Sequence, residues 1–272
     1  MVSFPNAKVN LGLNITEKRS DGYHNIESVF YPIAWADMLE VVKSEEQHFQ
    51  TTGLPIPGDA ANNLIIKAFD LLKNEGLMPD AHVNIHLHKI LPMGAGIGGG
   101  SADGAFMLKL LNEVFELNLS ITQLQGYASQ LGSDCSFFIE NKPMYCFGRG
   151  NEFETVNLDL SKKTWVLVNP QIHISTAEAY ASIKPQKPEV SIKEIIAQPI
   201  NTWKDTLVND FEIGLKDKYP KILEIKDKLY GLGAIYASMT GSGSTVFGIF
   251  DKELEGLSEM FSGCICWQGK GI

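Results

Sequence analysis

The chain has 272 residues, of which 44% are hydrophobic and 20% are charged, a composition typical of a water-soluble globular protein. This length allows one large domain or two of moderate size. The net charge of −9 argues against a general nucleic-acid binder and against a membrane-surface protein, because both normally present a basic face. We therefore expect neither a nucleic-acid partner nor a membrane partner.

The cysteines match neither a CxxC redox pair nor the spacing of a zinc site, so we expect free thiols in a reducing compartment. They are Cys135, Cys146, Cys264 and Cys266. The sequence shows no signal peptide, no apolar run of about 18 residues and no lipidation motif, which predicts a cytoplasmic protein. No pattern in the sequence indicates an oligomeric state.

Strands and helices are both predicted in the first part of the chain. Residues 7–15 alternate between apolar and polar side chains, which predicts a strand with one buried face and with Lys8, Asn10 and Asn14 together on its polar face. The further elements expected here are strands at 26–33 and 39–43, a helix at 62–75, a strand from Val83, a long helix to Glu116, a helix over 120–131 that begins with a capping box, and strands at 144–147 and 153–156.

A change in character at 157–163 predicts a boundary between two domains, 1–157 and 158–272. Strands are expected at 165–168, 234–239 and 245–250, with helices at 175–182, 191–197, 203–217 and 220–230. Because strands and helices mix without strict alternation, the pattern favours an α+β fold over a doubly wound sheet.

The segment 92–105 carries the strongest functional signal. Six of its fourteen residues are glycine, and five of these precede Ser101 at the start of an amphipathic helix. Glycine allows close backbone approach to a ligand, and a helix N-terminus attracts anions, so this loop predicts a phosphate site. No Gly-Lys-Ser/Thr follows, which excludes a Walker A loop. The spacing of Gly94, Gly96 and Gly99 fits a dinucleotide fingerprint, but the loop does not follow the first strand, which disfavours that interpretation.

Other candidate residues each have an ordinary structural explanation when taken alone. Lys8 fits a solvated strand lysine, Asp134 fits the N-cap of a short helix, and Tyr23-His24 fits a surface turn. The loop 240–244, Thr-Gly-Ser-Gly-Ser, is either a tight connection or a ligand loop. The histidines at 82, 86 and 88 lack a nearby carboxylate or cysteine, which favours a polar strand face over a metal site.

Together these segments resemble the GHMP kinase superfamily over nearly the whole chain. The resemblance rests on the segments 5–11, 21–24, 92–103, 131–134, 209–212 and 240–244. Ile97 and Ala102 depart from the leucine and serine common at these places, without affecting the backbone loop. The resemblance implies a two-lobed architecture, with an S5-domain-2-like N-terminal domain that binds ATP and a ferredoxin-like C-terminal domain.

The same resemblance implies the reaction. It is closest to members that phosphorylate the 2-hydroxyl of 4-diphosphocytidyl-2-C-methyl-D-erythritol, a small-molecule cytidine diphosphate substrate of the non-mevalonate isoprenoid pathway. ATP and Mg²⁺ are the implied cofactors. Asp134 is implied as the catalytic base and Lys8 as its partner, since a nearby lysine keeps a carboxylate ionised.

The binding residues implied by the resemblance form three groups. ATP would be held by Pro92, Met93, Gly94, Ala95, Gly96, Ile97, Gly98, Gly99, Gly100, Ser101 and Ala102, with Ser101 also a candidate Mg²⁺ ligand. The substrate would be held by Asn10, Tyr23, His24, Gly241 and Ser242. The alternatives are another kinase of the superfamily, such as a mevalonate or homoserine kinase, a catalytically silent nucleotide sensor, and a dinucleotide-binding oxidoreductase.

Overall fold

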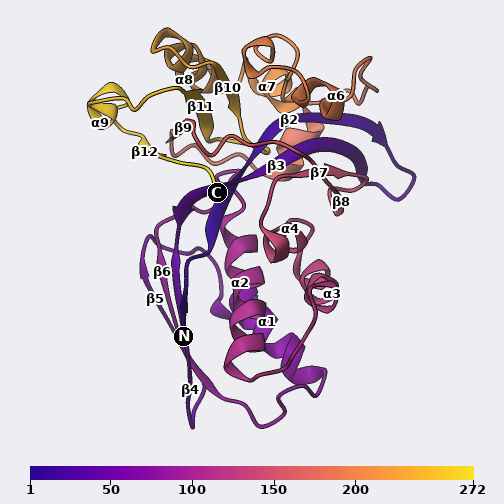
Figure 1. Cartoon of the computed structure of the whole chain (residues 1–272), viewed down its shortest axis with the longest axis vertical. Helices are drawn as coiled ribbons and strands as arrows, with labels where there is room; N and C mark the ends of the chain where they lie inside the picture. The colour runs from indigo at the N-terminus through magenta and orange to yellow at the C-terminus, as the bar shows by residue number, and fades with distance from the viewer. The chain divides into compact units, whose positions relative to one another are not determined.

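A computed structural model describes all 272 residues, and the chain divides into two compact units (Figure 1). Unit 1 comprises Met1–Ala7, Trp35–Met93 and Gly98–Asn141, and unit 2 comprises Lys8–Ala34, Gly94–Ile97 and Lys142–Ile272. The domain boundary expected near residue 157 falls inside unit 2. The compact units and the expected sequence domains are thus different divisions of the chain, and the boundary at 157 stays a prediction.

Unit 1 packs helices against one side of a four-stranded sheet (Figure 1). The strand order is β1-β4-β6-β5, in which β5 and β6 run parallel and the other pairs are antiparallel. Its elements are β1 (Val2–Ser3), β4 (Met38–Lys43), β5 (His48–Gly53), η1 (Ala60–Asn62), α1 (Leu64–Asn74), β6 (Val83–Lys89), α2 (Gly99–Val114), α3 (Ile121–Leu131) and α4 (Cys135–Glu140).

The strand predicted from Val83 is confirmed as β6, and its side chains alternate between a buried and a more exposed face. Val83, Ile85 and Leu87 are buried, while His86 and His88 are partly exposed on the other face. His86 Nε2 and His88 Nδ1 each lie 2.9 Å from Thr52 Oγ1 on the neighbouring strand β5. These two histidines therefore take part in a polar cross-strand contact, as expected for a polar strand face.

A buried ion cluster joins the sheet of unit 1 to α2. Lys89 Nζ lies 2.6 Å from Asp37 Oδ2 and 2.7 Å from Asp103 Oδ2, and all three side chains are buried. Asp37 Oδ1 accepts hydrogen bonds from the N–H groups of Ile90 and Leu91. Burial and the nearby Asp37 carboxylate raise the pKa of Asp103 to about 7, although the Lys89 ammonium opposes this change. Two carboxylates thus share one cation.

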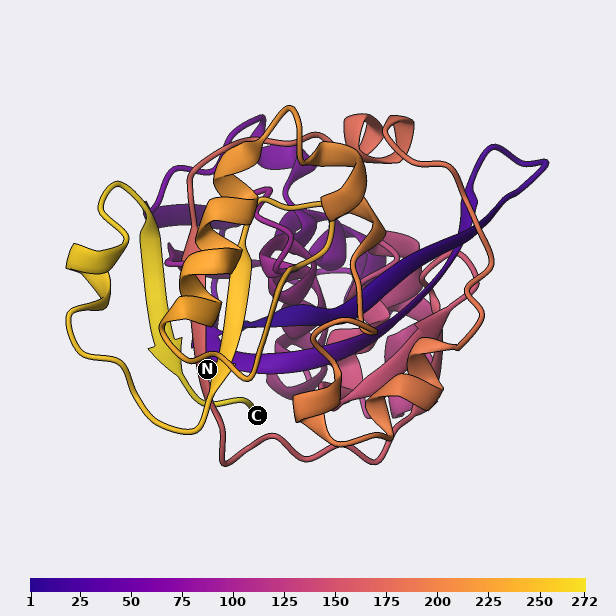
Figure 2. The ribbon, with the colours of Figure 1, turned by 90° about the horizontal axis from the view of Figure 1, so that it is seen from above.

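Unit 2 contains two four-stranded sheets, ordered β2-β3-β7-β8 and β10-β11-β9-β12. Figure 2 shows α8 lying over β10 and β11, where Ile222, Ile225 and Leu229 enter the apolar core. The elements are β2 (Asn6–Lys18) and β3 (His24–Ala36), whose outer ends belong to unit 1, then β7 (Met144–Phe147), β8 (Glu152–Thr155), β9 (Thr164–Asn169), α5 (Thr176–Ala181), α6 (Ile192–Ile196), η2 (Ile200–Thr202), α7 (Asp210–Leu215), α8 (Pro220–Gly231), β10 (Tyr236–Met239), β11 (Val246–Phe250), α9 (Leu257–Met260) and β12 (Ile265–Gly269).

Strand β2 departs from the regular alternation that its sequence predicts. Asn10 Nδ2 donates to Ser28 Oγ, whereas Asn14 Nδ2 donates to Glu27 Oε1. Because consecutive residues of β3 point to opposite faces, Asn10 and Asn14 lie on opposite faces of the sheet. The prediction of one shared polar face is therefore wrong. The cause is Gly12, whose φ of +65° places it in the left-handed region and which acts as a bulge that reverses the alternation.

Burial of β2 also differs from the prediction. Lys8, Asn10 and Asn14 are all buried, so the strand has no solvent-facing side over this stretch. Each of the three polar groups is hydrogen-bonded within unit 2, as buried polar side chains require. Both faces of the strand are therefore buried over this stretch, which a period-two pattern alone does not reveal.

The helix predicted at 203–217 is shorter in the structure. Asn209 Oδ1 accepts a hydrogen bond from the N–H of Phe211 and begins α7 at Asp210. Before it, Leu207 N–H donates to Trp203 C=O in a single turn, and both side chains are buried. Their spacing of four residues imitates a helical pattern, which explains the error.

Three sheet-edge strands, β1, β5 and β12, were not predicted, and β1 has only two residues. Residues of β5 are mostly exposed and those of β12 are half-buried, so these two strands lack the alternation that marks a strand. The four cysteines are free thiols, and the capping box of Ser120 and Gln123 at α3 is present, both as predicted. None of the helices is both long and apolar enough to cross a bilayer.

The buried cluster predicts an unusual pH dependence of stability. The pKa of Asp103 rises from its ordinary 3.8 to about 7 in the folded state. Between these values the folded state binds more protons at this group than the unfolded state, so its contribution to the free energy of unfolding falls as pH rises from about 4 to about 7. Urea denaturation should show wild type losing stability relative to Asp103→Asn over this range. A difference that stays constant from about pH 5 to about pH 8 would contradict the assignment.

Candidate functional site

The glycine-rich loop is divided between the two units. Gly94–Ile97 belongs to unit 2, and the chain from Gly98 onward belongs to unit 1. Gly94, Gly96 and Gly98 have φ values of +65°, +78° and +72°. The backbone enters the left-handed region at every second residue, which explains why glycine recurs at this spacing.

The first part of the loop packs tightly against the loop 240–244 of unit 2. A Cβ at Gly96 would lie 2.2 Å from the Thr240 carbonyl oxygen, so only glycine fits. The Thr240 hydroxyl donates to Gly96 C=O at 3.0 Å, and Thr245 N–H donates to Ala95 C=O at 3.3 Å. The loop 240–244 thus supports the glycine-rich loop through direct contacts.

The second part of the loop opens helix α2 in unit 1. Gly98 is the N-cap residue, and the first intrahelical hydrogen bond runs from Ala102 N–H to Gly98 C=O at 2.9 Å. The N–H groups of Gly99, Gly100 and Ser101 precede that bond and have no acceptor within the helix. A 16-residue helix with three such donors at its positive end suits a phosphate group.

Ser101 and Asp134 are brought near one another in unit 1 through Cys135. Burial raises the pKa of the Cys135 thiol to about 12, although the nearby Ser101 hydroxyl opposes this rise, and the Asp134 carboxylate is close enough to disfavour the thiolate further. Asp134 occupies the N-cap position of α4, but its side chain makes no capping hydrogen bond. Helix capping, the structural alternative for Asp134, therefore does not explain the residue.

Lys8 and Asn10 form a buried pair in unit 2. Lys8 is 3% exposed; its Nζ donates to Asn10 Oδ1 at 2.6 Å and lies 4.2 Å from the centre of the Phe30 ring. Asn10 N–H donates to Thr240 Oγ1 at 3.0 Å, and Lys8 N–H donates to Ile97 C=O at 2.9 Å. The structure thus brings Lys8, Asn10 and the first part of the glycine-rich loop together.

Tyr23 and His24 lie in a second cluster of unit 2. The Arg149 guanidinium lies 3.6 Å from the centre of the Tyr23 ring, which is 55% exposed and leaves its other face open. His24 stacks on Tyr180, with ring centres 4.8 Å apart and an interplanar angle of 21°. Burial, with a smaller contribution from Lys18, lowers the pKa of His24. The imidazole is therefore neutral at pH 7 and offers one donor and one acceptor.

Gly241 and Ser242 differ in their hydrogen bonding and exposure. Gly241 C=O accepts a hydrogen bond from Asn209 Nδ2 at 3.0 Å, and Asn209 Nδ2 also reaches Met239 C=O at 2.8 Å. Gly241 is therefore fixed by a buried asparagine. Ser242 is partly exposed at the tip of the same turn, where its side chain makes no hydrogen bond.

Met93 and Gly100 border a cavity of about 350 Å³ in unit 1. Asn62, Asn63 and Asp103 contribute polar groups to its lining, and Asp103 Oδ1 is buried without a hydrogen-bond partner. A buried acceptor that lacks a donor is expected to meet one on a ligand. Pro92, next to Met93, is partly buried.

Several residues of these clusters were not predicted as site residues. Phe30, Arg149, Tyr180 and Asn63 contact or surround predicted residues, yet they come from distant parts of the chain and belong to no local pattern. Asn209 and Thr240 lie in segments that carry the resemblance, but the sequence did not indicate what these two residues do.

Two known domain families match the chain. Residues 63–141 match the GHMP kinases N terminal domain, and residues 191–259 match the GHMP kinases C terminal domain. A 4-diphosphocytidyl-2-C-methyl-D-erythritol kinase from Bacteroides fragilis is 52% identical over 273 residues and covers 98% of both chains. A protein of the same name from Parabacteroides distasonis is 49% identical over 271 residues and covers 99% of both. The chain belongs to this kinase family.

Solved structures agree with that assignment. The crystal structure of a 4-(cytidine 5'-diphospho)-2C-methyl-D-erythritol kinase matches with a TM-score of 0.84 and 27% identity, covering 100% of this chain and 99% of the other. The mevalonate kinase of Methanococcus jannaschii matches with a TM-score of 0.72 at 15% identity, covering 100% and 98%, which shows the shared fold. The predicted α+β GHMP kinase fold is confirmed, and the chain is a kinase of this family.

The close approach at Gly96 yields a prediction with a matched control. Gly96→Ala should lower the free energy of unfolding by more than about 2 kcal/mol, because it combines left-handed strain with a backbone clash. Gly94→Ala shares the positive φ, but its Cβ would meet only the His173 ring, at 3.5 Å. That control should cost about 1 kcal/mol in chemical denaturation. Equal losses in the two variants would show that the contact with Thr240 is not limiting.

Proposed function

We propose that this kinase transfers the γ-phosphoryl group of ATP to the 2-hydroxyl of 4-diphosphocytidyl-2-C-methyl-D-erythritol, in the non-mevalonate route to isoprenoid precursors. The observation that carries the proposal is the identity of about half of all residues, over nearly the full length, with relatives named for this substrate. The clusters around Lys8, Asp134 and the glycine-rich loop support it, because each supplies a group that phosphoryl transfer requires.

ATP would be bound by the residues of the loop 92–102. The N–H groups that begin α2 offer donors to the phosphates, and they do so without a P-loop lysine. The cavity beside Met93 and Gly100 is of a size that suits a purine base, and Asp103 Oδ1 could accept a hydrogen bond from an exocyclic amine.

Ser101 and Asp134 fit an Mg²⁺ ion by the chemistry of their atoms. Both offer hard oxygen donors near Cys135, and Mg²⁺ in kinases commonly takes one or two protein oxygens besides phosphate and water. When bound, the ion would neutralise charge on the phosphate oxygens. The Ser101 hydroxyl is the donor that we assign to it.

Asp134 would accept the proton of the attacking hydroxyl, and Lys8 would supply fixed positive charge. The Asp134 side chain makes no capping hydrogen bond, which supports a chemical role for this residue. Asn10 and Phe30 hold the Lys8 ammonium in one place, which removes the conformational freedom of a surface lysine. A held cation suits the equatorial oxygens of a transferring phosphoryl group.

The cytidine end of the substrate would meet Tyr23 and His24. The open face of Tyr23 offers a stacking surface, and Arg149 on its other face holds the ring in place. The neutral His24 ring, held by Tyr180, would contact the polar edge of cytosine. Asn10, Gly241 and Ser242 would lie along the substrate phosphates.

Substrate choice tests the proposal directly. We expect ATP-dependent ADP release with 4-diphosphocytidyl-2-C-methyl-D-erythritol and none with mevalonate, homoserine or galactose. A coupled assay on the purified enzyme with Mg²⁺ measures this. Turnover with mevalonate or homoserine alone would favour another kinase of the superfamily. ATP binding without turnover on any of the four compounds would favour a silent nucleotide sensor.

Substitution of the two proposed catalytic residues tests their roles. Asp134→Asn should lower kcat by about 10²–10⁴-fold with ATP binding retained, because it removes the proton acceptor at constant volume. Lys8→Met should also lower kcat while keeping the aliphatic stem. If the two residues act as one unit, the double variant should be little worse than the poorer single variant. An unchanged kcat in Asp134→Asn would exclude this residue as the base. A loss of kcat in the double variant equal to the product of the two single losses would show that the two residues act independently.

A further inference from the structure

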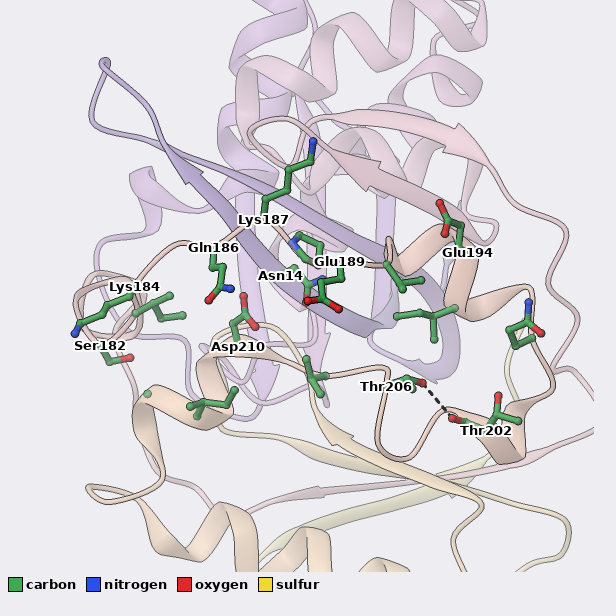
Figure 3. A pocket seen from close by; sticks show the side chains of 18 residues that line it. Asn14, Ser182, Lys184, Gln186, Lys187, Glu189, Glu194, Thr202, Thr206 and Asp210 are labelled. Carbon is green, nitrogen blue, oxygen red and sulfur yellow. Dashed lines mark hydrogen bonds between the residues drawn. The ribbon is translucent and has the colours of Figure 1, made fainter.

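A large cavity in unit 2 is lined by none of the residues assigned to phosphoryl transfer. Its volume is about 970 Å³, within the range of cavities that bind small organic molecules (Figure 3). The segment 182–190, α6, the loop before α7 and the start of α7 form its walls, and Asn14 of β2 lies at its base. Gln186 N–H donates to Ile15 C=O at 3.0 Å, which fastens the segment 182–190 along β2.

Asn14 marks the polar end of this cavity. Its side chain is 6% exposed, and its Nδ2 donates to Glu27 Oε1 at 3.0 Å. Its Oδ1 accepts no hydrogen bond, although the residue lines the cavity. The amide oxygen of a residue that lines the cavity and that has no partner in the protein is free to accept a hydrogen bond from a ligand.

The charged groups around Asn14 are also acceptors. Asp210 uses one oxygen to accept the Ile15 N–H at 2.7 Å and forms no ion pair. Glu27, buried behind Asn14, is held by Asn14 and by the Tyr145 hydroxyl at 2.7 Å, again without a cation. Burial and the Glu27 carboxylate raise the pKa of Asp210. The carboxylates at this end of the cavity are therefore held by neutral donors and form no ion pair with a side chain of the protein.

The other charged side chains of the lining place no positive charge beside Asn14. Figure 3 shows the Glu189 carboxylate directed toward Asn14, whereas the ammonium groups of Lys184 and Lys187 point away from it. Glu194 lies farther along the rim (Figure 3). A ligand at the base of the cavity thus meets Asn14, Asp210 and Glu189 and no cation.

The walls of the cavity are apolar beyond this end. Val190, Val208 and Ile213 line it and are exposed large hydrophobic residues, and Ile183 and Ile195 continue the same lining. Exposed apolar surface that gathers in one concave place marks a binding site more often than scattered residues do. We propose that this cavity binds a small aliphatic amine, with an ammonium group on Asn14, Asp210 and Glu189 and with its carbon chain along the apolar walls.

This site is separate from the residues proposed for phosphoryl transfer. Lys8 and Asn10 lie on the Ser28 face of the sheet, whereas Asn14 lies on the Glu27 face. The bulge at Gly12 produces this division within one strand. Amine binding can therefore be measured without ATP or a cytidine nucleotide, so a failure here is distinguishable from a failure of the proposed reaction.

Calorimetric titration with 1,6-diaminohexane tests the proposal, with 1,6-hexanediol as the uncharged probe at matched ionic strength. We expect one saturable binding event with the diamine and none with the diol. Asp210→Asn keeps an oxygen for the Ile15 N–H but removes the charge, and it should weaken binding at least about tenfold. Glu189→Gln alters an exposed side chain that folding does not need, and it should weaken binding several-fold.

Glu255→Gln is the matched control, because it makes the same change of charge at an exposed residue outside the cavity. Its affinity for the diamine should equal that of wild type. The proposal is overturned by the absence of saturable binding, by equal binding of the diol, or by equal affinities in Asp210→Asn and Glu255→Gln. Complete displacement of the diamine by an equal concentration of Mg²⁺ would assign the site to inorganic cations and overturn it as well.

Discussion

The contact between Thr240 and Gly96 is the constraint on which the architecture of unit 2 depends. The Thr240 hydroxyl accepts the Asn10 N–H and donates to Gly96 C=O, so one side chain joins the first long strand, the glycine-rich loop and the turn between β10 and β11. These three segments are separated by up to 230 residues along the chain. Their close approach requires an absent Cβ at Gly96, and the position of Lys8 follows from the same arrangement.

Buried polar groups recur as the means by which distant segments are fixed. Asn209 holds two carbonyl groups of the 239–241 turn, and Lys89 holds Asp37 and Asp103 in unit 1. Each such group loses hydration on folding and is retained only because its partners are placed to replace that water. Asp103 Oδ1 is buried without a partner and is therefore informative, since Asp103 borders a cavity.

The parts of the fold that the sequence predicts well are those fixed by local chemistry. The capping box of α3, the alternation of β6 and the glycines of the loop at 94–98 all act within a few residues. The errors come from long-range effects. Trp203 and Leu207 share a helical spacing because both enter the core of unit 2, and edge strands such as β5 pair without a buried face.

The candidate site shows the same division. The phosphate loop could be predicted from its own residues, because glycine content and a helix start are local properties. Lys8 and Asp134 had ordinary structural explanations, and the resemblance to a kinase family supplied their roles. Phe30, Arg149 and Tyr180 became visible only when strands and loops from distant parts of unit 2 were placed beside one another.

The left-handed residue Gly12 gives β2 a further property. In a regular strand, alternate side chains point to the same face of the sheet. The face that each residue occupies is therefore fixed by the register of the whole strand. The bulge at Gly12 breaks this alternation, so the faces occupied after it no longer follow from those occupied before it. The residues before it and after it can be optimised by evolution for different neighbours, as if they belonged to two short strands. A single backbone angle thus allows the polar residues before Gly12 and those after it to point to different faces of the sheet within one continuous strand.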